Sequence, residues 1–88
     1  MEDSKIDEGK NYLRYLSKHF ENVELNKDKL GGMPIIKGTR INISLVLSCL
    51  RDGMSIEDIC EDYNINKNQI KEAIDYVIEI LNKPFYED

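Results

Sequence analysis

The segment that most constrains the fold is residues 31–44, which read GGMPIIKGTRINIS. Glycines admit backbone angles that other residues avoid, proline fixes its own φ, and β-branched residues favour extended backbone. The pattern predicts a small β-hairpin. Its first strand holds Ile35 and Ile36, the chain reverses at Gly38 and Thr39, and residues 40–43 form the second strand. The preceding residues 22–25, NVEL, are also typical of a short strand.

Helix signals dominate the rest of the chain. Residues 1–21 have the spacing of an amphipathic helix. Ser44 is a candidate cap for a short helix that ends before Gly53, and Ser55 opens another at about 56–62. Asn66 begins a third, which runs from about 67 to near Asn82. Its expected core-facing stripe is Ile70, Ala73, Ile74, Val77, Ile78 and Leu81.

The chain has 88 residues, 41% hydrophobic and 33% charged, which fits one compact domain. We expect an N-terminal helix at 1–21, a helix-turn-helix domain with a β-hairpin arm at 22–82, and a tail at 83–88. No apolar run approaches the roughly 20 residues that span a bilayer, and the N-terminus is acidic rather than signal-like. A cytoplasmic protein without membrane contact is therefore expected.

Charge is unevenly distributed along the chain, whose formal net charge is −5. Residues 27–51 hold five basic side chains and one acidic side chain, giving +4, whereas the other residues together give −9. An anionic partner should therefore meet the basic segment.

Residues suited to catalysis or metal binding are sparse. Cys49 and Cys60 are expected to be reduced core thiols, and His19 is the only other soft ligand. The glycines of the opening segment do not have P-loop spacing. We expect no enzymatic activity, no metal and no cofactor.

The two helices around residues 64–66 form the pattern of a helix-turn-helix, whose second helix can enter the DNA major groove. Basic side chains would contact phosphates, and amides would read bases. The candidate DNA-binding residues are Lys37, Arg40, Lys67, Asn68, Gln69 and Lys71. Three features oppose this interpretation: Glu72, Asp75 and Glu79 would repel phosphates, similar three-helix modules bind proteins, and Arg40 has the alternative of pairing with the acidic body.

Residues 31–76 resemble the bacterial family known as domain of unknown function 433. The shared signature consists of Gly31, Gly32, Pro34, Ile36, Gly38, Thr39, Arg40 and Ile41, followed by an apolar helix and Gly-Met-Ser. The chain departs from the family at Met33, where lysine is frequent, and at Asn42, where proline is usual. The resemblance implies a mainly helical, homeodomain-like helix-turn-helix core. Some members of the family are VapB-like antitoxins encoded beside PIN-type ribonuclease toxins.

These observations predict a non-catalytic DNA-binding regulatory module that acts on its own promoter and has a PIN-type toxin as its partner. The alternative is a protein-interaction or dimerisation module that does not bind nucleic acid. We also expect a homodimer, because apolar and aromatic residues remain beside the expected core stripe. The candidate residues for a dimer or partner interface are Tyr12, Tyr15, Tyr76, Ile80, Phe85 and Tyr86, of which Phe85 and Tyr86 belong to the tail expected to contact the toxin.

Overall fold

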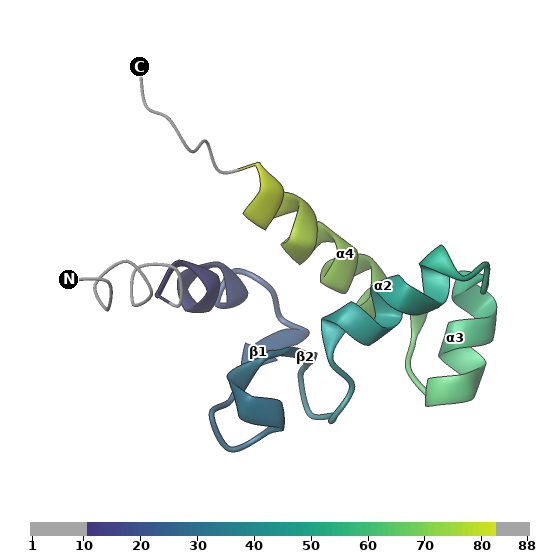
Figure 1. Cartoon of the computed structure of the whole chain (residues 1–88), viewed down its shortest axis with the longest axis horizontal. Coiled ribbons are helices and arrows are strands. Elements are labelled where there is room, and N and C mark those ends of the chain that lie inside the picture. The colour runs from purple at the N-terminus through teal and green to yellow at the C-terminus, as the bar shows by residue number, and fades with distance from the viewer. Residues whose placement is uncertain (1–10, 83–88) are drawn as a thin grey trace.

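The structure is a computed structural model that describes residues 11–82 (Figure 1). Residues 11–17 are helical, and two short strands follow, β1 (Val23–Leu25) and β2 (Pro34–Ile36), with the 3-10 turn η1 (Leu30–Gly32) between them. Three helices complete the described chain: α2 (Ile43–Arg51), α3 (Ile56–Tyr63) and α4 (Lys67–Leu81). The predicted mainly helical class with a small antiparallel hairpin is confirmed.

The hairpin is built from different segments than predicted. β2 pairs antiparallel with β1, so that Val23 lies opposite Ile36 and Leu25 opposite Pro34. Residues 40–43 do not form the second strand, and they contribute only an isolated bridge between Ile35 and Asn42. The physical reason is the early start of α2 at Ile43, because Asn42, although extended and bridged to Ile35, already serves as the N-cap of that helix.

The predicted reversal at Gly38 and Thr39 is confirmed. The Thr39 backbone N–H donates to the Ile36 carbonyl (3.0 Å), and Gly38 has a φ of 80°. A positive φ at this position of a turn favours glycine. Thr39 Oγ1 reinforces the turn, since it donates to the Ile36 carbonyl (2.7 Å) and accepts from the Ile41 N–H (3.0 Å).

The helix starts follow local capping signals, with one correction. Ser55 caps α3 as predicted, and Asn66 with Gln69 forms a complete capping box on α4. The predicted Ser44 cap of α2 is wrong. Asn42 is the N-cap, and its side-chain oxygen accepts from the Leu45 N–H (2.8 Å). Members of the resembled family usually have proline at this position. Proline has no side-chain oxygen that could cap a helix.

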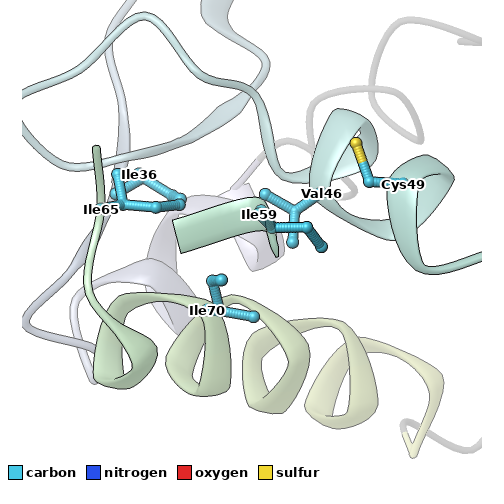
Figure 2. Packing of buried hydrophobic residues seen from close by; sticks show 6 residues of the cluster. All are labelled: Ile36, Val46, Cys49, Ile59, Ile65 and Ile70. Carbon is cyan, nitrogen blue, oxygen red and sulfur yellow. The ribbon is translucent and has the colours of Figure 1, made fainter. Parts of the chain in front are cut away.

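The interior consists of two apolar clusters. The first, which we call the trihelical core, joins β2 to α2, α3 and α4 (Figure 2). Its buried members are Ile36, Val46, Cys49, Ile59, Ile65 and Ile70. The second, the N-terminal core, joins residues 11–17 and β1 to α2 and α4. Its buried members are Leu16, Val23, Ile43, Ala73 and Tyr76. Helix α4 thus contributes to both clusters.

Tyr76 lies at the centre of the N-terminal core, which corrects the predicted orientation of α4. Its side chain is 0% exposed, although we expected it on a surface stripe. Conversely, Ile78 and Leu81 were assigned to the core but are 46% and 76% exposed. The N-terminal helix causes the difference, because it gives α4 a second apolar neighbour on the side where Tyr76 lies.

Candidate nucleic-acid interface

A three-residue turn connects α3 to α4 and fixes their relative placement. Asn64 ends α3 in the left-handed conformation (φ 54°, ψ 49°), and the Ile65 N–H donates to the Cys60 carbonyl (3.1 Å). The Ile65 side chain is buried in the trihelical core, and Asn66 caps α4. Two helices held by such a turn have the helix-turn-helix arrangement.

The first turns of α4 expose Lys67, Asn68 and Lys71, whereas Gln69 is half-buried. Neither lysine makes an ion pair with any of residues 11–82. Both amides already have partners. Gln69 Oε1 accepts from the Asn66 backbone N–H (2.7 Å), and Asn68 Nδ2 donates to Glu72 Oε2 (3.3 Å). Reading adenine needs an acceptor and a donor together, so the cap competes with base contact at Gln69.

A contact between distant segments joins α4 to the strand region. The Asn22 backbone N–H donates to Glu72 Oε1 (3.0 Å), and Asn22 Nδ2 donates to Glu72 Oε2 (2.5 Å). The Lys37 N–H in turn donates to the Asn22 carbonyl (2.8 Å). We call this arrangement the Asn22 bridge. It brings the Lys37 peptide close to the second turn of α4, and no sequence motif signals it.

The turn after β2 carries the other two predicted DNA-binding residues, Lys37 and Arg40, and both are exposed. The turn is braced by Glu24, whose Oε1 accepts from the Gly38 N–H (2.9 Å) and lies 3.6 Å from Lys29 Nζ. The Gly38 hydrogen bond, with the Lys29 charge, lowers the pKa of the Glu24 carboxyl. Arg40 forms no ion pair within residues 11–82, so the alternative pairing with the acidic body is absent there.

The four predicted interface residues within residues 11–82 differ in exposure. Tyr15 is 60% exposed, with its ring 4.9 Å from that of His19. Tyr12 and Ile80 are half-buried against the N-terminal core, and Tyr76 is inside it. Two further candidates, Phe85 and Tyr86, lie outside the described residues.

An apolar groove of about 210 Å³ lies elsewhere, where the end of η1, β2, α2 and α4 meet. Sequence reasoning missed it, because its walls come from three separate segments. Its lining residues are Met33, Pro34, Ile43, Ser44, Leu47, Tyr76, Val77 and Ile80.

The two thiols are free, as predicted, with Cys49 buried and Cys60 half-buried. Cys49 Sγ lies 4.0 Å from Tyr63 Oη, and this hydrogen bond raises the pKa of Tyr63 above its ordinary value. Within residues 11–82, no three His, Cys, Asp or Glu side chains are grouped to hold a metal ion. None of the helices in this range is both long and apolar enough to cross a membrane.

Comparisons with known proteins found two similar proteins and one matching family model. The uncharacterized protein Rv2308 of Mycobacterium tuberculosis is 30% identical over 61 residues, which are 69% of this chain and 26% of that protein. The crystal structure of Rv2018 from the same organism matches with a TM-score of 0.56 and 28% identity. That match covers 60% of this chain and 25% of Rv2018, so the chain spans about a quarter of the length of these relatives. The family model described as "Protein of unknown function (DUF433)" matches residues 23–77, and the chain therefore belongs to this family.

Proposed function

We propose that the chain is a non-catalytic regulatory module that binds DNA through the start of α4 and the turn after β2. One observation carries the proposal. The Asn22 bridge connects the Lys37 peptide to Glu72, the sequence neighbour of Lys71 on α4, and Lys37, Lys67 and Lys71 have no ion-pair partner within residues 11–82. Unpaired cations gathered from two segments are suited to a phosphate backbone.

The acidic residues of α4 are compatible with this placement. Glu72 already accepts hydrogen bonds from Asn22 and Asn68, so its charge is partly compensated by their dipoles. Asp75 and Glu79 are exposed on later turns of α4. They would confine phosphate contact to the first two turns, which is where recognition helices usually present their N-terminal residues. Asn68 is the best placed base-reading residue, because Gln69 serves the cap.

The test is binding of the full chain to DNA upstream of its own gene, measured by fluorescence anisotropy over a salt series. Each phosphate contact adds about 0.9 to the slope of log K against log salt. We expect Arg40→Ala or Lys71→Ala to weaken binding to all sequences and to reduce the slope by about one. Asn68→Ala should instead relax sequence preference.

Arg51→Ala provides the matched control, because Arg51 Nε already lies 3.0 Å from Asp52 Oδ1 at the end of α2. Its salt slope should equal that of the wild type. Absence of binding at low salt would reject the DNA-binding proposal.

The apolar groove favours a second candidate function, a dimerisation module, with a second copy of this chain as the occupant. The same helix that lines the groove with Val77 and Ile80 also exposes Ile78 and Leu81. A groove and an exposed apolar ridge on one molecule are what a two-fold, self-complementary contact requires.

Light scattering at micromolar concentration tests this dimer. We expect a dimer mass for the wild type and a folded monomer for Leu81→Glu, which changes an exposed residue and leaves both cores intact. Lys67→Glu on the other end of α4 should remain dimeric. A monomeric wild type would refute the homodimer.

The PIN-type ribonuclease partner is proposed on the family resemblance. The candidate contact segments are the N-terminal helix and residues 83–88. Co-expression with the product of the neighbouring gene should yield a complex that purifies together. Full neutralisation of that product by a chain lacking both end segments would exclude them as the contact.

A further inference from the structure

A second concave surface lies away from the α3–α4 turn, between the N-terminal helix and β1. It is a cleft of about 440 Å³. Two of its cations come from the helical end, Arg14 and Lys18, and a third, Lys37, comes from the residue after β2. Basic side chains from two separate segments of the chain therefore line the same cleft.

None of these three cations makes an ion pair within residues 11–82, although the Lys37 charge contributes to the lowered pKa of Glu24. Arg14 lies in the helix of residues 11–17 and Lys18 in the turn that follows it, and both line the cleft. Of the two acidic side chains in the cleft, Glu24 is already engaged by the Gly38 N–H and by Lys29. The other, Glu21, is exposed and makes no ion pair within residues 11–82, so the cleft holds three cations against two carboxylates.

Apolar side chains also line the cleft, and we call them its floor. Val23 is buried, and Phe20 and Leu25 are half-buried beside it. The one hydroxyl there is satisfied, because Ser17 Oγ donates to the Arg14 carbonyl (2.6 Å). Apolar walls strengthen the attraction between cations and an anion above them. This chemistry suits a phosphodiester, whose charged oxygens would meet the cations while its sugar covers the apolar floor.

We propose that this cleft binds a backbone phosphate of the same DNA that contacts α4, with Arg14 and Lys18 as its clamp. The proposal rests on the proposed DNA-binding function and extends it to the N-terminal helix. Lys37 provides the continuity, since it lines the cleft while its peptide is joined through Asn22 to α4. The phosphate contacts would thus run from Lys71 through Lys37 to Arg14.

The experiment compares the double variant Arg14→Ala, Lys18→Ala with the wild type in the same anisotropy salt series. We expect its salt slope to fall by about one, because the two cations clamp a single phosphate, with the preference between sequences unchanged. The charge-conserving double variant Arg14→Lys, Lys18→Arg should restore the wild-type slope. Arg14 and Lys18 are exposed, so thermal melting should show both variants folded. A wild-type slope in the double alanine variant would overturn the proposal that the cleft binds DNA phosphate. It would not contradict the proposed contacts of α4.

If the wild type does not bind DNA at all, the proposed function is rejected, and so is DNA as the molecule that supplies the phosphate to this cleft. A nuclear magnetic resonance titration with dimethyl phosphate then tests whether the cleft binds a phosphodiester anion from another source. Shifts at the Lys18 and Lys37 amides that vanish in the double alanine variant would support an anion site for a different phosphodiester. No shifts at these amides would overturn the site itself.

Discussion

Replacing Tyr76 with alanine is expected to lower the free energy of unfolding by about 3–5 kcal/mol, the usual range for truncating a buried aromatic residue. The ring is fully buried and packs edge-to-face on Phe20, with centroids 5.8 Å apart. Its hydroxyl donates to the Leu13 carbonyl (2.9 Å), so the substitution also releases the N-terminal helix. Urea unfolding monitored by circular dichroism measures the loss, which is a large fraction of the stability of a domain this small.

Two control variants separate the contributions of Tyr76. Tyr15→Ala removes an exposed ring from the N-terminal helix and should change stability by less than about 1 kcal/mol. Tyr76→Phe keeps the ring and removes only the hydrogen bond, which should cost about 1 kcal/mol at neutral pH. A loss in Tyr76→Ala no larger than in Tyr15→Ala would contradict the central position of this side chain.

Tyr76→Phe also predicts a difference at alkaline pH. Burial raises the pKa of Tyr76 to about 12, whereas an unfolded tyrosine ionises near pH 10. The native state therefore holds a proton that the unfolded state releases, and stability falls as pH rises from about 10 to 12. This decline should be about 2 kcal/mol smaller in Tyr76→Phe, as measured by urea unfolding at each pH.

Glu72→Ala is expected to lower the free energy of unfolding by about 2–3 kcal/mol. Two hydrogen bonds from Asn22 end on this carboxylate, and bonds to charged groups each contribute about 1.5–3 kcal/mol, less than additively for a shared partner. The variant should also speed amide hydrogen exchange at Asn22 and Lys37, because the Asn22 bridge holds both peptides.

Asp75→Ala is the matched control for Glu72→Ala, since Asp75 is an exposed carboxylate on the next turn of the same helix. Stability should be nearly unchanged in this variant. Both variants remove one negative charge from α4. Only Glu72→Ala also loosens the Lys37 peptide, because the Asn22 bridge depends on Glu72. Equal exchange rates at Asn22 in the two variants would contradict the bridge.

The sequence predicted the starts of α3 and α4 because their capping signals are local. Ser55 and the Asn66–Gln69 pair lie within three residues of the N–H groups that they cap, so the starts of α3 and α4 can be read directly. The reversal at Gly38 is equally local, since it depends on the backbone freedom of one residue.

The strand pairing and the site could not be read in this way, because they depend on distant partners. Ile35 and Ile36 fit a hairpin with either neighbouring segment, and the early start of α2 decides for β1. Asn22 and Glu72 are 50 residues apart, and neither residue stands out in composition or spacing. The rotation of α4 likewise depends on packing against the N-terminal helix, which the periodicity of α4 alone does not contain.

The turn between α3 and α4 determines which side chains of α4 face the core and which face solvent. Only three residues separate Tyr63 from Lys67. Asn64 ends α3 in the left-handed conformation and Asn66 caps α4, so the conformation of this connection is fixed at both ends. One inserted or deleted residue there would shift the register of α4 by about 100° and turn part of its buried face toward solvent. Changes in what this helix contacts must therefore arise by substitution on a fixed face, at positions such as Asn68 and Lys71, while the length of the turn stays constant.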